Sequence, residues 1–147
     1  MKKMILIVAF LTLSLCAFGA LKDGNYNAEE EKYNWFGWKG YLKITVKNGA
    51  ISEVEYDHKN KEGNLQSTDK KYNDSMYKSK KTDPKTFTVK LEKELLEKQS
   101  AQNIDAIAGA TQSKDKFVQL AKLLLEKAEK GETGDYVMKK SKLEKIK

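Results

Sequence analysis

Hydrophobic and polar residues alternate along residues 41–47, and a period of two predicts a half-buried β-strand. Asn48-Gly49 follows directly, and both residues tolerate a positive φ, so the pair predicts a tight hairpin turn. The return strand covers residues 50–58. The alternation puts Leu42, Ile44 and Val46 on one face of the first strand, and it puts Val54, Tyr56 and His58 on one face of the second.

Two later segments have the three-to-four-residue spacing of amphipathic helices. The first starts at Asp83-Pro84, where aspartate can cap and proline suits the first helical position, and runs to Lys98. The second follows Ser113, the expected cap, and stops at Gly131. The residues expected in the core are Phe87, Leu91 and Leu95 of the first helix and Phe117, Leu120, Ala121, Leu124 and Ala128 of the second.

The remaining segments are short. Residues 23–28 are expected to form a first strand, and the polar stretch 59–81 a loop with a short helix at 70–77. Residues 104–107 are apolar enough for a strand or a tight approach to the next helix. The lysine-rich tail, 132–147, is expected to be loosely ordered. Together these elements predict an α+β fold, a small antiparallel sheet with a hairpin packed by two main helices.

The first nineteen residues are typical of a secretory signal peptide, with two lysines, an apolar run at 4–15 and small residues at Ala17 and Gly19. The apolar run is shorter than the roughly 18 residues of a transmembrane helix. We therefore expect cleavage after Gly19 and one folded domain at residues 20–131.

Cys16 is the single cysteine and lies inside the leader. It is a candidate for lipidation, although Leu15 precedes it where lipoprotein signals have a small residue, so we expect plain cleavage after Gly19. The exported chain then has no thiol for disulfides, nucleophilic catalysis or metal binding. The expected location is periplasmic, at the cell surface or secreted.

The formal net charge is +7 and falls by two, to +5, when Lys2 and Lys3 leave with the leader. Every basic residue is lysine, whereas base readout and bidentate phosphate binding favour arginine. The charges are also interleaved along the chain, so we expect a solvated surface and no nucleic-acid partner. Weak attraction to an anionic membrane surface or an acidic partner remains open.

Residues 105–113, Asp-Ala-Ile-Ala-Gly-Ala-Thr-Gln-Ser, place a small-residue turn before an amphipathic helix. Backbone N–H groups at a helix start attract anions, and small residues let a ligand approach the backbone. Thr111 and Ser113 add hydroxyl groups, so the segment is suited to a phosphate. Physical grounds alone favour an ordinary capped helix after a tight turn over a phosphate site, and the segment matches neither a Walker loop nor a dinucleotide fingerprint.

Residues 105–111 resemble the Asp-x-x-(Ser/Thr/Ala)-Gly-Ala-Thr signature of the FMN-binding domain family, found in flavin subunits of sodium-pumping NADH:quinone reductases and Rnf-type complexes. Asp23-Gly24-x-Tyr26 and the hairpin around Asn48-Gly49 also match the family's pattern. The resemblance implies covalent FMN, joined to Thr111 as a phosphoester by a flavin transferase. It also implies a cofactor site formed by Asp105, Ala108, Gly109, Ala110 and Ser113, with Ala108 standing where serine or threonine is frequent.

The resemblance implies an electron carrier rather than a complete enzyme, because the chain has no room for a second domain that would turn over a substrate. The expected partners are the flavin transferase and a membrane or extracellular redox partner. The alternative is an exported binding or surface-antigen domain of the same fold that carries no flavin.

Four aromatic residues at positions 35–41 can either stack on an isoalloxazine ring or belong to the core, and Trp38 is the one we assign to the site. They are Trp35, Phe36, Trp38 and Tyr41. His58 is the only histidine and is expected at an exposed strand end, next to an equally unexceptional Asp57. We expect no metal site and no hydrolytic arrangement of residues.

Overall fold

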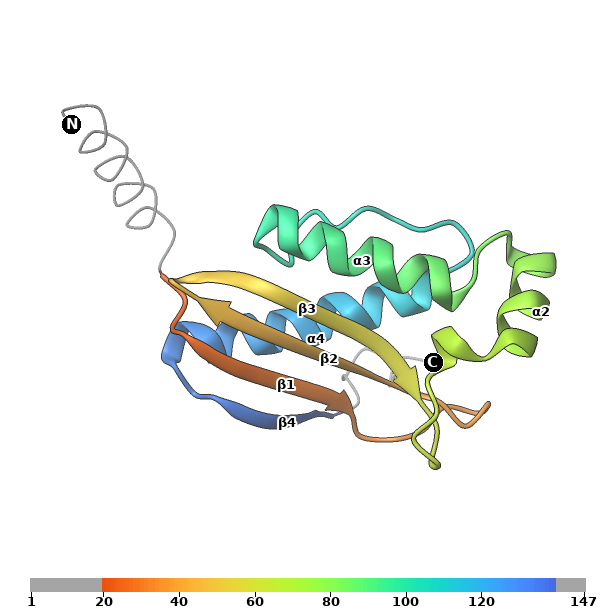
Figure 1. Cartoon of the computed structure of the whole chain (residues 1–147), viewed down its shortest axis with the longest axis horizontal. Helices are drawn as coiled ribbons and strands as arrows, with labels where there is room; N and C mark the ends of the chain where they lie inside the picture. Colours follow the sequence, from red (N-terminus) through yellow and green to blue (C-terminus); the bar gives the residue numbers. More distant parts are fainter. Residues whose placement is uncertain (1–19, 140–147) are drawn as a thin grey trace, which may run out of the picture.

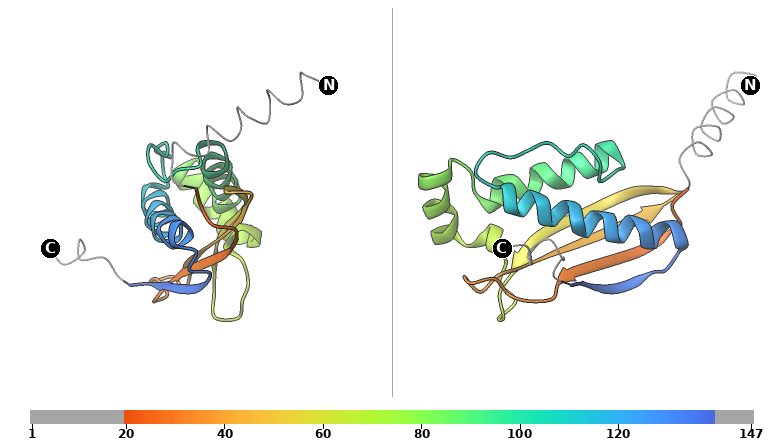
Figure 2. Two further views of the ribbon diagram at one scale, coloured as in Figure 1. Left: turned by 90° about the vertical axis from the view of Figure 1, so that its left-hand side faces the viewer. Right: turned by 180° about the vertical axis from the view of Figure 1, so that it is seen from behind.

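The computed structural model describes residues 20–139. Helices α3 and α4 lie on one face of a four-stranded sheet whose strand order is β3-β2-β1-β4 (Figures 1 and 2). The leader with Cys16 and the end of the lysine-rich tail lie outside the described residues. The elements in chain order are β1 (Gly24–Glu30), β2 (Lys39–Lys47), β3 (Ala50–Lys59), the 3-10 turn η1 (Gln66–Thr68), α2 (Lys70–Lys80), α3 (Pro84–Lys98), α4 (Thr111–Lys130) and β4 (Gly134–Met138).

The predicted hairpin is confirmed. Strands β2 and β3 pair antiparallel across Asn48-Gly49, whose φ angles of 55° and 78° are both positive. The pairing shifts between Thr45 and Val46, which leaves Ser52 as an extra residue on β3. Because of this bulge, Ile51 also turns its side chain into the core, where it is 3% exposed.

Both main helices are confirmed, with every predicted core residue of each one buried. The Asp83 side chain accepts a 2.8 Å hydrogen bond from the backbone N–H of Thr86 and caps α3, with Pro84 in the first helical position. Gly131 ends α4 with a φ of 71°, a left-handed conformation that glycine adopts without strain. The short helix in the polar loop is confirmed as α2.

Two expectations about the remaining segments are wrong, the purely antiparallel sheet and the loosely ordered tail after Gly131. The sheet is mixed rather than antiparallel, because β4, inside the predicted loose tail, pairs parallel with β1. Helix α4 runs back along the sheet, so a strand that follows it through a short turn runs in the same direction as β1 (Figure 1). Of the two alternatives for residues 104–107, the structure has the irregular approach to α4 and not the strand. None of the helices within residues 20–139 is long and apolar enough to cross a membrane.

Candidate functional site

The predicted site lies in the connection between α3 and α4, and three buried side chains hold this connection on the core. Ile104, Ile107 and Ala110 are 6%, 7% and 4% exposed. The residues between them, including Asp105 and Ala108, face outward. The turn therefore has an apolar anchor at every third residue and presents small side chains and backbone to solvent.

Gly109 allows another part of the chain to approach the turn. Its φ is +84°, and a Cβ added there would lie only 2.6 Å from the backbone oxygen of Lys80 and 3.3 Å from Cγ2 of Thr82. The sequence suggested that glycine makes room for a ligand. In the structure, the space on this side of Gly109 is taken by the end of α2, so the glycine also docks α2 against the turn.

Helix α4 begins at Thr111, three residues before the predicted start, and Ser113 is not its cap. The N-cap is Ala110, which has no side-chain oxygen, and its carbonyl accepts the first helical bond from the N–H of Lys114 at 3.0 Å. The helix starts early because Ala110 is buried and its N–H already bonds the carbonyl of Ile107 at 3.0 Å. The first turn thus offers uncapped N–H groups beside the exposed Thr111, which suits an anion.

Asp105 is tied to α3. Its carboxylate lies 3.6 Å from Nζ of Lys98 and its side chain is 70% exposed, while its backbone N–H donates to Glu94 at 3.1 Å. The pKa of Lys98 is raised, mainly because its ammonium group donates a hydrogen bond to Glu94. No hydrogen bond joins Asp105 to Thr111 within residues 20–139.

A buried polar pair lies under the first turn of α4, and sequence reasoning missed it. The hydroxyl of Tyr56 donates to the carbonyl oxygen of Ser113 at 3.0 Å and lies 3.4 Å from Nε2 of His58. His58 is 5% exposed, so its predicted surface position is wrong. Burial lowers the pKa of His58 from 6.5 to about 4. The strand alternation, which puts His58 on the same face as Tyr56, was the available signal.

Distant elements complete this cluster. Glu30, at the end of β1, accepts from the N–H of Gly40 at 2.6 Å and pairs with Lys116 of α4 at 2.9 Å. Nδ1 of His58 has no hydrogen-bond partner among residues 20–139. Asp57 is also buried, and its carboxylate accepts hydrogen bonds from the backbone N–H of His58 at 2.8 Å and from the hydroxyl of Ser67. The expectation that Asp57 is an unexceptional residue at an exposed strand end is therefore wrong.

The four aromatic candidates divide into two pairs. Trp38 is 7% exposed and packs edge-on against Tyr72 of α2, with ring centroids 6.0 Å apart, and Tyr41 is also 7% exposed. Trp35 and Phe36 are 95% and 73% exposed. Trp38 and Tyr41 therefore have packing roles, and contact between Trp38 and a flavin stays a prediction.

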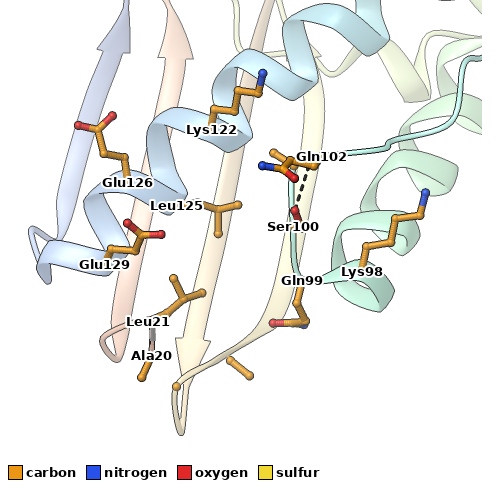
Figure 3. A pocket seen from close by; sticks show the side chains of 13 residues that line it. Ala20, Leu21, Lys98, Gln99, Ser100, Gln102, Lys122, Leu125, Glu126 and Glu129 are labelled. Atoms are coloured by element: carbon orange, nitrogen blue, oxygen red, sulfur yellow. Dashed lines mark hydrogen bonds between the residues drawn. The ribbon is translucent and has the colours of Figure 1, made fainter. Parts of the chain in front are cut away.

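A cavity of about 810 Å³ lies elsewhere, against the C-terminal half of α4 (Figure 3). Lys122 in its wall is eleven residues beyond Thr111, a separation of about 16 Å along the helix. The cavity and the motif are thus separate places. We assign the site to the motif because the uncapped N–H groups and the threonine hydroxyl occur there. No group of three metal-ligating side chains occurs within residues 20–139.

These features define a class of protein, a small α+β domain with an uncapped helix start beside an exposed threonine hydroxyl. The family model of the FMN-binding domain matches residues 37–126, which is more than half of the chain. The chain belongs to this family.

One further protein and two solved structures are similar to this chain over most of its length. The 15 kDa lipoprotein of Treponema pallidum (strain Nichols) is 35% identical over 120 residues, covering 82% of this chain and 85% of the lipoprotein. A crystal structure from Clostridium perfringens is 38% identical with a TM-score of 0.78, covering 82% of this chain and 99% of that one. A solution structure from Clostridium thermocellum is 30% identical with a TM-score of 0.51, covering 74% and 92%.

Replacing Gly109 with alanine tests the docking of α2 on the turn. Gly63 is the matched control, since its φ of +83° is nearly the same but no atom lies within 4 Å of an added Cβ. We expect Gly63→Ala to cost about 1 kcal/mol from backbone strain alone and Gly109→Ala to cost about 1–3 kcal/mol more because of the collision. Urea unfolding measures both. Equal costs would show that the contact with Lys80 is unimportant.

The buried histidine predicts a pH dependence of stability. The folded protein accommodates the neutral ring, so the stabilising contribution is fully present above pH 6.5 and is lost as pH falls toward the folded pKa of about 4. The loss reaches on the order of 3 kcal/mol. Unfolding free energies between pH 7 and pH 4 should therefore decline more steeply for the wild type than for His58→Asn. Parallel curves for the two proteins would contradict this.

Proposed function

We propose that this chain is an exported FMN-binding electron-transfer protein whose FMN is joined by a phosphoester to Thr111. The observation that carries the proposal is the uncapped start of α4. An exposed threonine hydroxyl ends a small-residue turn there, inside the segment matched by the FMN-binding domain family.

Several residues of the turn would hold the phosphate, each in a different way. Thr111 supplies the ester oxygen, and the N–H groups and dipole of the first helical turn stabilise the remaining phosphate charge. Ala108 and Ala110 keep bulk away from the attachment point. By the family resemblance, Asp105 would stand near the hydroxyl or near a metal of the flavin transferase during attachment. Its carboxylate lies 3.6 Å from Nζ of Lys98.

The bound isoalloxazine supplies the redox chemistry, and the protein supplies attachment, orientation and tuning of the potential. The described fold is one small domain whose site lies at the surface, which suits a carrier that exchanges electrons with a membrane or extracellular redox partner. Export is supported by the leader pattern and by similarity to a protein named as a lipoprotein. A covalent link keeps the cofactor where it cannot readily be replaced.

The rival function is an exported binding or surface-antigen domain without flavin. The colour of the purified protein distinguishes the flavin carrier from the flavin-free domain. Protein purified from its native host should be yellow, and the flavin should stay on the chain through denaturation and precipitation. A colourless protein from a host that possesses the transferase favours the rival.

The attachment residue can be tested by mutation in a host that has the transferase. Thr111→Ala removes the ester oxygen, so flavin fluorescence on a denaturing gel should disappear while the fold persists. Thr111→Ser keeps an oxygen and should retain part of the signal. The intact mass of each variant quantifies the attachment.

Ser113→Ala is the matched control. Ser113 lies at the third helical position and caps nothing, so its hydroxyl should be dispensable for both flavin and stability. Covalent FMN on Thr111→Ala but not on Ser113→Ala would move the acceptor to Ser113.

Export can be tested by the same mass measurement on native protein. We expect the chain to begin at Ala20 or Leu21, because the small pair before the cleavage point is Ala17 and Gly19. A chain that begins at Met1 and stays in the cytosolic fraction would refute the location, and a lipid mass on Cys16 would replace cleavage by anchoring.

A further inference from the structure

Two neighbouring aromatic side chains protrude from the connection between β1 and β2. Trp35 is 95% and Phe36 is 73% exposed, which makes them the two most exposed large hydrophobic residues of the described chain. Indole and phenyl rings normally bury a large area, so two adjacent rings in water indicate a contact with another surface. We call residues 34–38 the aromatic finger.

The exposure of the finger is built into its backbone. Oδ1 of Asn34 accepts hydrogen bonds from the N–H groups of Phe36 at 2.9 Å and Trp38 at 3.0 Å. The N–H of Asn34 donates to the carbonyl of Trp38 at 2.7 Å, closing the turn. At the base of the finger, Trp38 is buried against Tyr72. A closed turn on a buried base therefore holds the two rings outward.

A basic helix lies beside the finger. The contact of Trp38 with Tyr72 joins the finger to α2, and both lie at the same end of the sheet, opposite the start of the described chain (Figures 1 and 2). Residues 69–85 contain six lysines and three aspartates, so this segment has a net positive charge. Within the described part of the chain, Lys70 is the one α2 lysine with an ion pair, to Asp74 at 2.6 Å. The exposed lysines without one are Lys71, Lys78 and Lys80 of α2, Lys81 directly after it, and Lys85 in the first turn of α3.

We propose that the aromatic finger and α2 together dock the protein on an anionic phospholipid bilayer. Tryptophan and phenylalanine insert at the boundary between headgroups and acyl chains, and lysines are attracted to anionic headgroups. Two rings offer about 300–500 Å², whereas a stable protein partner needs about 800 Å² on each side. A protruding aromatic tip with a lysine-rich helix at the same end of the molecule fits a bilayer better than a protein surface. The proposal is independent of flavin attachment.

Vesicle sedimentation tests the proposal with the chain from Ala20 onward, which keeps the whole sheet and core. Wild type should pellet with phosphatidylglycerol vesicles at low salt and remain in the supernatant with phosphatidylcholine vesicles. Trp35→Ala/Phe36→Ala should weaken the partition constant by about tenfold or more. Each replacement of Lys71, Lys78, Lys80 or Lys81 by glutamine should weaken it by about fivefold.

The matched control is Val89→Ala/Val137→Ala, which removes two exposed apolar side chains from α3 and β4 and should leave vesicle binding unchanged. In Trp38→Phe, Trp35 is the only tryptophan, and its emission should shift to the blue on binding. The proposal is overturned if the wild-type protein does not bind anionic vesicles, or if the finger variant and the control variant bind them equally. A finger variant that changes the flavin spectrum but not vesicle binding would assign the rings to the cofactor instead.

Discussion

The apolar stripe of α4 on the inner face of the sheet is the contact on which the rest of the molecule depends. Its five core residues have no exposed surface, and the ring of Phe117 meets that of Tyr56 edge-on, with centroids 4.9 Å apart. This packing fixes the helix along its whole length, so it also fixes where the first turn lies and where its N–H groups point. The position of Thr111 is therefore a consequence of burial far along the same helix.

The candidate site combines an open outer side with a closely packed inner side. Outside, the turn presents small residues and an uncapped helix start. Inside, Ile107 and Ala110 anchor it, and the hydroxyl of Tyr56 holds the carbonyl of Ser113. The end of α2 closes on Gly109 from a third direction. A ligand phosphate at Thr111 would therefore meet a preorganised backbone, which lowers the cost of ordering the site on binding.

The same end of the molecule carries the site, the basic helix α2 and the aromatic finger, because the end of α2 packs on Gly109 and its Tyr72 packs on Trp38. Membership of the FMN-binding domain family explains the turn and the helix start. It does not explain why Trp35 and Phe36 stand in water on a hydrogen-bonded turn. In the proposed electron carrier, such a surface would bring the end that holds Thr111 to the bilayer.

Local patterns in the sequence determined the hairpin, the start and end of α3, the stripe of α4 and the turn before Thr111, because alternation, caps and helical spacing act within a few residues. Only the tertiary structure decided the parallel strand β4, the true start of α4 at Thr111 and the burial of His58 and Asp57. Each of these depends on partners far away in the chain. Strand β4 needs β1 as its neighbour, the helix start needs a buried Ala110, and a polar side chain is buried only where other elements cover it or bond it.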